Sequence, residues 1–155
     1  MSVGPEAFRA SLRKFASGIT IVTVALGDAL YGMTCTSFAS VSLDPPLVLV
    51  CLENDSHTLN AVTQARSFAV SVLGEAHEDL ARAFSTPGTK PFHLLGGRAE
   101  DGAPMADEPP AWLECSVEKI FEAGDHHVVL GLVEACGTNG NKPLLYFDRR
   151  YHRLR

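Results

Sequence analysis

The segment from Tyr31 to Ser42, YGMTCTSFASVS, places small polar side chains between two hydrophobic runs. It holds one glycine, one thiol and five hydroxyl side chains: Thr34, Thr36, Ser37, Ser40 and Ser42. One interpretation is a strand and turn whose hydroxyls cap the backbone, as serine and threonine often do. The other is a ligand site, because small residues let the main chain approach a heterocycle rich in hydrogen-bond donors and acceptors. An isoalloxazine ring is a heterocycle of this kind.

A second candidate is the triplet Ser56-His57-Thr58, which follows an apolar run and the short loop 53–55. The pattern places this triplet at the start of a helix. Free N–H groups and hydroxyls at a helix N-terminus form an anion site, so the triplet could hold a phosphate. Ser56 could equally be an ordinary N-cap residue.

A third candidate is Gly124-Asp125-His126, where a tight turn would present a histidine at the start of a strand. That histidine could contact a ligand or face solvent. None of the six histidines belongs to an H-E-x-x-H or comparable motif, so we expect no metal site. The chain also lacks G-x-G-x-x-G and P-loop motifs, so any nucleotide would bind by another architecture.

The elements that would position these residues follow from hydrophobic periodicity and turn signals. Helices are predicted over Pro5–Ala16, Ser56–Ala65 and Glu75–Phe84. Strands are predicted over Ile19–Leu26, Ala29–Thr36, Leu47–Leu52, Ser67–Leu73, Trp112–Phe121 and His126–Ala135, with a last strand pair within 143–154. The apolar run 47–52 is expected to be buried on both faces. The irregular segment 85–109 is long for a loop and is expected to be functional or packed on a partner.

Six or more strands, short helices and no regular strand–helix alternation predict a mainly β protein. We expect a β-barrel with added helices rather than a doubly wound sheet. The 155 residues suit a single domain over 1–155. An apolar content of 46% and a charged content of 20% are typical of a soluble globular protein. The net charge of −5 argues against a nucleic-acid partner.

The sequence gives no sign of a membrane span or of secretion. No run of about 18 apolar residues occurs. The first residues have no apolar signal core, so we expect a cytoplasmic location. The four cysteines form no C-x-x-C pair and are expected to be reduced thiols.

Six segments in chain order carry a resemblance to a known family: FASGITIVT (15–23), GMTCTSFASVSLDPPLVLVCL (32–52), S-x-T (56–58), FAVSVL (68–73), GDHHVVLGLV (124–133) and PLLYF (143–147). Together they resemble the flavin reductases with an FMN-binding split barrel, the small reductase components of two-component flavin monooxygenases. The resemblance implies a six-stranded Greek-key split barrel, a homodimer and a bound FMN or FAD. It also implies NADH or NADPH as hydride donor and release of reduced flavin to a separate oxygenase.

The resemblance further implies roles for individual residues. Those that match segments lining or bordering the flavin are Gly32, Met33, Thr34, Cys35, Thr36, Ser37, Ser40, Val41, Cys51, Leu52, Glu53, Phe84 and Ser85. Ser56, His57 and Thr58 match the segment that holds the phosphate. His126 matches the histidine near the nicotinamide and is the candidate catalytic residue, with Tyr146 and Tyr151 beside the nicotinamide site. We expect His126 to orient the nicotinamide or exclude water.

The chain departs from the family pattern at two places. Thr36 stands where asparagine or valine is common, and Arg149 stands where glycine is frequent. Arg149 and Arg150 add positive charge either near a pyridine nucleotide or on a solvated turn. Two other functions stay open: an electron carrier that holds flavin tightly, and an oxidase similar to pyridoxamine-phosphate oxidase on the same barrel.

Overall fold

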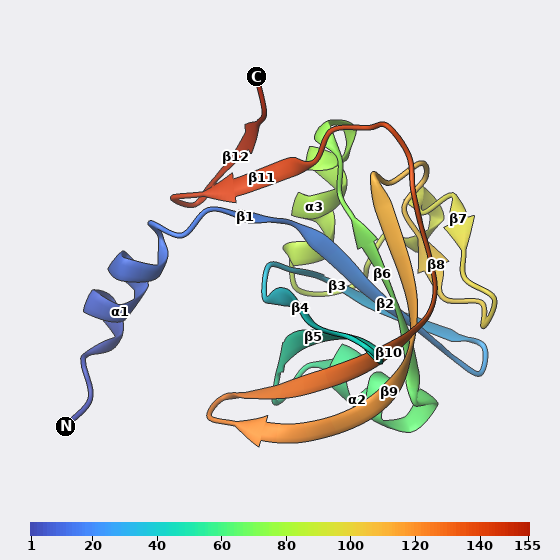
Figure 1. Cartoon of the computed structure of the whole chain (residues 1–155), viewed down its shortest axis with the longest axis horizontal. Coiled ribbons are helices and arrows are strands. Elements are labelled where there is room, and N and C mark those ends of the chain that lie inside the picture. Colours follow the sequence, from blue (N-terminus) through green and yellow to red (C-terminus); the bar gives the residue numbers. More distant parts are fainter.

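A seven-stranded antiparallel sheet forms the body of the computed structural model, which describes residues 1–155 (Figure 1). The strands follow the spatial order β3-β2-β6-β9-β10-β5-β4. Their bounds are β2 (Thr20–Leu26), β3 (Ala29–Cys35), β4 (Phe38–Leu43), β5 (Pro46–Glu53), β6 (Ser67–Val72), β9 (Ala111–Ala123) and β10 (His126–Thr138). The mainly β class expected from the sequence is confirmed.

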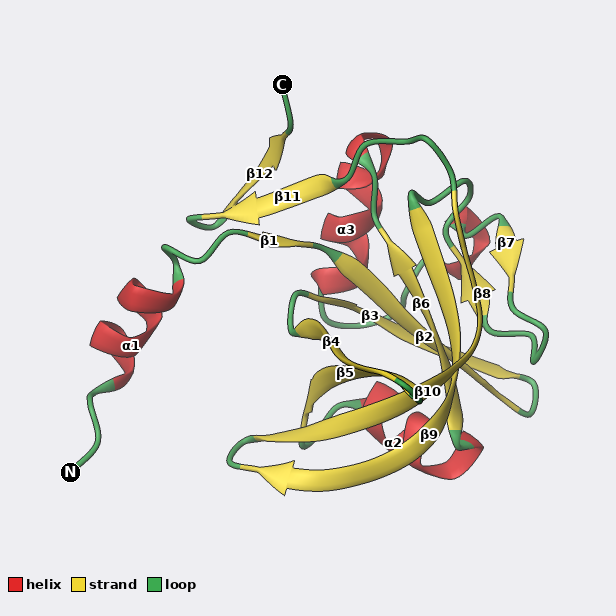
Figure 2. Ribbon diagram, viewed as in Figure 1, coloured by secondary structure: helices red, strands yellow, loops and turns green.

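The two edge strands of this sheet are neighbours in sequence. β3 and β4 lie at opposite edges, yet only Thr36 and Ser37 connect them. So short a connection forces the sheet to curl until its edges meet, as Figure 2 shows. The N–H of Cys51 on β5 donates to the carbonyl of Ser37 at 3.2 Å, which extends the pairing of β4 with β5 into this connection.

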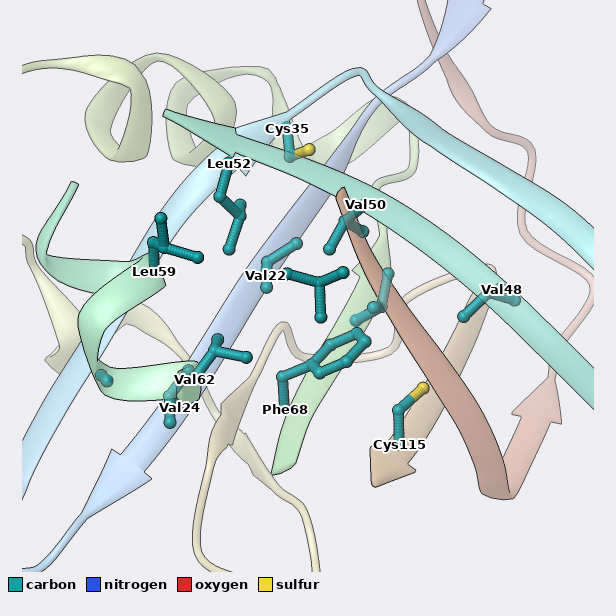
Figure 3. Close-up of a cluster of buried hydrophobic side chains, with 13 residues drawn as sticks. Val22, Val24, Cys35, Val48, Val50, Leu52, Leu59, Val62, Phe68 and Cys115 are labelled. Atoms are coloured by element: carbon teal, nitrogen blue, oxygen red, sulfur yellow. The ribbon is translucent and has the colours of Figure 1, made fainter. Parts of the chain in front are cut away.

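The inner face of the curled sheet packs the main hydrophobic core (Figure 3). Alternate residues of β5 contribute to it, and Val48, Val50 and Leu52 are at most 6% exposed. The residues between them, such as Leu49, are only half-buried. The prediction that 47–52 is buried on both faces is therefore wrong for the single chain: one face of β5 is covered by the core and the other is partly open.

Two helices pack against the sheet. Helix α2 (His57–Ala65) inserts Leu59 and Val62 into the main core. Helix α3 (Glu78–Ser85) buries Leu80 and Phe84 in a second core beside β2 and β3. The predicted helix from 75 to 84 begins as a short 3₁₀ turn, η1 (Glu75–His77), before α3. None of the helices is long and apolar enough to cross a membrane.

The predicted irregular segment contains small elements that continue this packing. They are the 3₁₀ turn η2 (Phe92–Leu94) and the strand pair β7 (Gly97–Arg98) and β8 (Pro104–Met105). The Thr23 hydroxyl on β2 donates to the carbonyl of Pro104 at 2.5 Å. This segment therefore folds back on the sheet.

Segments near the two ends of the chain form a second, three-stranded sheet. Strand β1 (Ser17–Gly18) pairs with β11 (Leu144–Phe147), which pairs with β12 (Arg150–Arg153). Helix α1 (Pro5–Leu12) precedes β1 and extends away from the body in Figure 1. It is shorter than the predicted 5–16 helix and has no buried residue. Its apolar side chains are largely exposed: Phe8 and Leu12 are each 54% exposed, and Phe15 just beyond the helix is 77% exposed.

The hydroxyl-rich segment contains one strand that the sequence pattern did not predict. Phe38–Leu43 forms the edge strand β4, which pairs with β5 through a register shift between Ser40 and Ser42. That irregularity interrupts the alternation of apolar and polar residues by which strands are recognised.

Candidate functional site

A pocket of about 760 Å³ opens between β3, the loop from β5 to α2, and the segment that follows α3. It brings together three predicted cofactor segments that are far apart in sequence. The predicted residues that line it are Gly32, Met33, Thr34, Glu53, Ser56, His57, Thr58, Phe84 and Ser85. Its volume is within the usual range for small-molecule and cofactor sites.

In the pocket wall formed by β3, Gly32 lets neighbouring groups pack close to the main chain, and the hydroxyl of Thr34 is already hydrogen-bonded. A Cβ on Gly32 would lie 3.3 Å from the Phe92 ring and 3.1 Å from the Thr23 side chain. A larger residue would therefore crowd both neighbours, and glycine avoids this crowding. The Thr34 hydroxyl donates to the carbonyl of Ala81 in α3 at 2.6 Å. Toward the pocket this hydroxyl can therefore act only as an acceptor.

The opposite wall is the N-terminus of α2. Ser56 is its N-cap, and its hydroxyl accepts from the N–H of Leu59 at 3.1 Å. The first N–H groups of a helix have no intrahelical acceptor, so those of His57 and Thr58 are available to an anion. Ser56 is therefore the N-cap, as one interpretation of the triplet expects, and the phosphate-binding role of the triplet stays a prediction.

A lysine that sequence reasoning missed lines the same pocket. Lys90 and its neighbour Thr89 come from the irregular segment after α3. The Lys90 amine contacts the Thr86 carbonyl. Partial burial lowers the pKa of Lys90. The only sequence signal was a lysine within the long loop that was expected to be functional.

The remaining predicted flavin residues lie outside this pocket. Cys35 is buried in the core, and burial raises the pKa of its thiol. The Ser37 hydroxyl donates to the Cys51 carbonyl at 2.9 Å and ties the connection between β3 and β4 to β5. The others are the exposed Thr36, the β4 residues Ser40 and Val41, and the buried Leu52 on β5. Their predicted contact with the flavin stays a prediction.

His126 stands beside the pocket at the first position of β10. It lies directly opposite Glu53 in the sheet register, and Glu53 lines the pocket. Its Nδ1 lies 2.6 Å from Oδ1 of Asp125. This hydrogen bond is the main cause of the lowered pKa of Asp125. When Nδ1–H donates to Asp125, the imidazole is oriented and Nε2 is left free.

Asn54 joins the histidine turn to the helix end. Its backbone N–H donates to the Asp125 carbonyl at 3.1 Å, and its Nδ2 donates to the Gly124 carbonyl at 3.0 Å. Its Oδ1 lies 2.8 Å from Nδ1 of His127. Since Asn54 lies two residues before the N-cap Ser56, the candidate phosphate site and the candidate catalytic turn form one connected unit.

The two predicted nicotinamide tyrosines lie together on the terminal hairpin. The ring centroids of Tyr146 and Tyr151 are 5.5 Å apart. The Arg82 guanidinium of α3 lies 4.6 Å from the centroid of the Tyr151 ring. Burial raises the pKa of Tyr151. Neither tyrosine lines the 760 Å³ pocket, so their predicted role is not tested by its geometry.

The chain belongs to the flavin reductase like domain family, whose model matches residues 12–155. The family predicted from the six sequence segments is confirmed, and with it the class of the protein, a flavin-linked oxidoreductase.

Individual relatives agree with this assignment. The chain is 41% identical over 145 residues to a probable flavin reductase of Rhizobium meliloti (strain 1021). The match covers 92% of this chain and 46% of that protein. It is 35% identical over 153 residues to an NADH:FMN oxidoreductase of Rhodococcus erythropolis, covering 94% of this chain and 80% of that protein. The chain therefore spans about half the length of the first relative and most of the second.

Solved structures share the fold over nearly the whole chain. The NADH:FAD oxidoreductase SgcE6 of Streptomyces globisporus C-1027, in complex with NAD and FAD fragments, superposes with a TM-score of 0.92 at 35% identity. The match covers 100% of this chain and 97% of that chain. The flavin reductase PheA2 gives a TM-score of 0.92 at 33% identity and covers 99% of both chains.

Proposed function

We propose that this chain is an NAD(P)H:flavin oxidoreductase that transfers a hydride from the nicotinamide to FMN or FAD. The observation that carries the proposal is the pocket beside β3. Its lining combines Gly32, the N-terminus of α2 and Lys90. A reduced nicotinamide is the donor in the named relatives, an NADH:FMN and an NADH:FAD oxidoreductase.

The residues of this pocket fit the two chemically different parts of a flavin. The unpaired N–H groups of His57 and Thr58, with the Lys90 amine, suit a phosphate. The close approach allowed by Gly32, with the apolar side chains of Met33 and Phe84, suits a flat ring. These features support a flavin seated along β3 with its phosphate at the start of α2.

When bound, the flavin supplies the centre that accepts the hydride, so the protein needs no nucleophile of its own. The protein's contribution is to hold the flavin and the nicotinamide in the geometry that hydride transfer requires, and to exclude water. His126 is proposed to orient the nicotinamide at the pocket rim, with its ring fixed by Asp125. Tyr146 and Tyr151 are proposed to contact the nicotinamide. Cys35, Thr36, Ser37, Ser40, Val41, Cys51 and Leu52 are proposed to continue the flavin-binding surface.

We propose that six of the seven strands of the curled sheet form a Greek-key split barrel and that two copies of the chain associate. The half-buried outer residues of β5 support a second copy, because an apolar face that the chain leaves open needs a cover. Val41 and Leu43 on the adjacent edge strand are also exposed. Analytical ultracentrifugation that gives a monomer at micromolar concentration would contradict the homodimer.

We further propose that the reduced flavin is passed to a separate oxygenase. A relative at 38% identity over 151 residues is the reductase component of 4-hydroxyphenylacetate 3-monooxygenase from Thermus thermophilus, and the match covers 96% of both chains. A cytoplasmic location is proposed because NADH and NADPH are supplied there. An oxygenase activity that requires direct contact with this chain rather than diffusing flavin would contradict release.

The deciding experiment is oxidation of NADH and of NADPH by the purified protein, with and without added FMN or FAD. We expect flavin-dependent turnover that rises with added flavin. A yellow protein that holds flavin but does not oxidise either nicotinamide would favour the electron carrier. Gly32→Leu should weaken flavin binding, because a side chain there would meet Phe92 of the pocket lining; since it would also meet Thr23 on β2, its melting curve is compared with that of the wild type.

A further inference from the structure

The hairpin of β11 and β12 carries Tyr151 on its outer strand. Strand β12 is the edge of the three-stranded sheet and pairs only with β11. The position of Tyr151 relative to the body of the molecule therefore depends on side-chain contacts. Its ring is half-buried and packs on the second core, which also contains Phe84 and Phe92 of the flavin pocket lining. The hairpin and the flavin pocket thus share one packed region.

Arg82 of α3 is the charged residue that contacts Tyr151 in this region. Its guanidinium carbon lies 4.6 Å from the centroid of the Tyr151 ring. Its Nη2 donates to Oε1 of Glu78, one turn earlier on α3, at 2.9 Å. The cation is therefore held between a carboxylate of the helix and an aromatic ring of β12. A guanidinium over an aromatic face is attracted by the charge distribution of the ring.

The main chain of Arg82 is tied to the flavin pocket by the last residues of the same helix. The hydroxyls of Ser85 and Thr86 both donate to the Arg82 carbonyl, at 2.8 Å and 2.9 Å. Ser85 and its neighbour Phe84 line the flavin pocket. Arg82 therefore connects the pocket-lining end of α3, through its carbonyl, with Tyr151, through its side chain.

The contact with Arg82 matters more for Tyr151 than for the stability of the fold. The Arg82 side chain is 61% exposed, and exposed ion pairs of this spacing contribute little to stability. The Tyr151 hydroxyl nevertheless responds to groups on α3: burial raises its pKa, and Arg82 and the Ser85 side chain both lower it. Tyr151 is thus coupled to Arg82 and to a residue of the pocket lining.

We propose that Arg82 is a positioning residue for the reaction, which holds the Tyr151 ring in place beside the flavin pocket so that Tyr151 contacts the nicotinamide. The proposal rests on the proposed reductase function and on the proposed role of Tyr151. Because Arg82 acts through Tyr151, its side chain determines the affinity for the nicotinamide nucleotide. Its contacts with Ser85 and Thr86 are made by the backbone carbonyl, so the affinity for flavin is independent of the side chain.

The test is Arg82→Met, which removes the charge and keeps an unbranched side chain. Arg153→Met is the matched control, because Arg153 pairs with the same Glu78, at a longer distance of 3.7 Å, and is 59% exposed. Its guanidinium is stacked on no aromatic ring. Arg82→Met should raise KM for NADH and NADPH about two- to fivefold, as expected for one partly exposed cation–π contact, and leave the Kd for FMN unchanged.

The other variants should behave differently. Arg153→Met should change KM by less than Arg82→Met, and both should melt close to the wild type. Arg82→Lys, which keeps a cation for the ring, should restore KM toward the wild-type value. A KM unchanged in Arg82→Met, or raised equally in Arg153→Met, would overturn the proposal.

The pKa of Tyr151 gives a readout that a purely structural role of Arg82 would not change. It is measured by NMR on protein with isotope-labelled tyrosine rings, with Tyr151→Phe to identify the signal. Arg82→Met should raise this pKa above the wild-type value, because the charge that lowers it is lost. Arg153→Met should leave it in place. An unchanged pKa in Arg82→Met would refute the contact.

Calorimetric titration of the FMN-loaded protein with NAD⁺ separates this proposal from the reductase function. We expect Arg82→Met to bind NAD⁺ about two- to fivefold more weakly than the wild type and Arg153→Met. Arg82-dependent NAD⁺ binding in a protein that oxidises neither nicotinamide would refute the reductase function and support the positioning role. Absence of NAD⁺ binding by the wild-type protein would overturn the positioning role.

Discussion

Replacing Asn54 by alanine should separate the histidine turn from the phosphate loop. The change removes two side-chain hydrogen bonds, to the Gly124 carbonyl and to His127, and leaves the backbone bond to Asp125. Each bond contributes about 1 kcal/mol to stability. Because both are exposed and water can replace part of them, we expect a combined loss of about 1 kcal/mol.

The effect on stability should be smaller than the effect on reaction geometry. A loss of about 1 kcal/mol lowers the melting temperature of a protein of this size by about 2–4 °C. Loss of the two Asn54 side-chain hydrogen bonds also lets His126 and the start of α2 move relative to each other, although neither is mutated. We therefore expect Asn54→Ala to raise KM for NADH and the Kd for FMN together, each by several-fold.

The measurement is a melting curve together with steady-state kinetics at 25 °C, where the variant is still folded. Asn60→Ala is the matched control, because Asn60 is exposed on α2 and its side chain bonds only to Gln64 at 3.1 Å. In a double-mutant cycle, Asn54→Ala and His126→Ala should be less than additive in KM for NADH. Full additivity, or kinetic constants equal to those of Asn60→Ala, would refute the positioning role of Asn54.

Four further outcomes are expected. Ser56→Ala should cost about 1 kcal/mol of stability and weaken FMN more than riboflavin in fluorescence titrations; equal weakening would remove the phosphate role. His126→Ala should impair NADH oxidation more than flavin binding. Equal loss of both would contradict the proposed role of His126 in orienting the nicotinamide. Gly131→Ala should destabilise the fold by about 1–3 kcal/mol in urea, because its Cβ would lie 2.5 Å from the Phe68 ring; a wild-type midpoint would contradict this packing. The Cys115 thiol, whose pKa burial raises to about 12, should stay unmodified by a disulfide reagent at pH 8 until the protein unfolds; rapid labelling would show an open core.

Local patterns were sufficient for the elements that have one buried face. The hairpin of β2 and β3 and the amphipathic α2 were predicted almost to their ends, because periodicity and turn residues agree there. Strand β4 was missed because its register shift breaks the alternation. Helix α1 was predicted too long, since its apolar spacing continues to Phe15 although the helix ends at Leu12.

The site shows a different limit of sequence reasoning. The segments around Gly32 and Ser56 were identified from motifs, and the structure brings them into one pocket. Lys90 was missed because an irregular loop has no periodicity that indicates where it folds back. Asn54 was missed because its role depends on a turn about seventy residues later, a contact that only the pairing of β5 with β10 creates.

The hydroxyl-rich segment is polar for a structural reason as well as a chemical one. The Thr34 hydroxyl is bonded to α3, and the Ser37 hydroxyl both donates to and accepts from Cys51 on β5. These two hydroxyls tie β3 to α3 and the connection between β3 and β4 to β5, so they are largely unavailable as donors to a ligand. Main-chain N–H groups must then supply the donors along this wall, and their positions do not depend on which side chain stands at Thr36. The departure from the family pattern at Thr36 is therefore compatible with flavin binding, provided that the Ser37–Cys51 hydrogen bonds are kept.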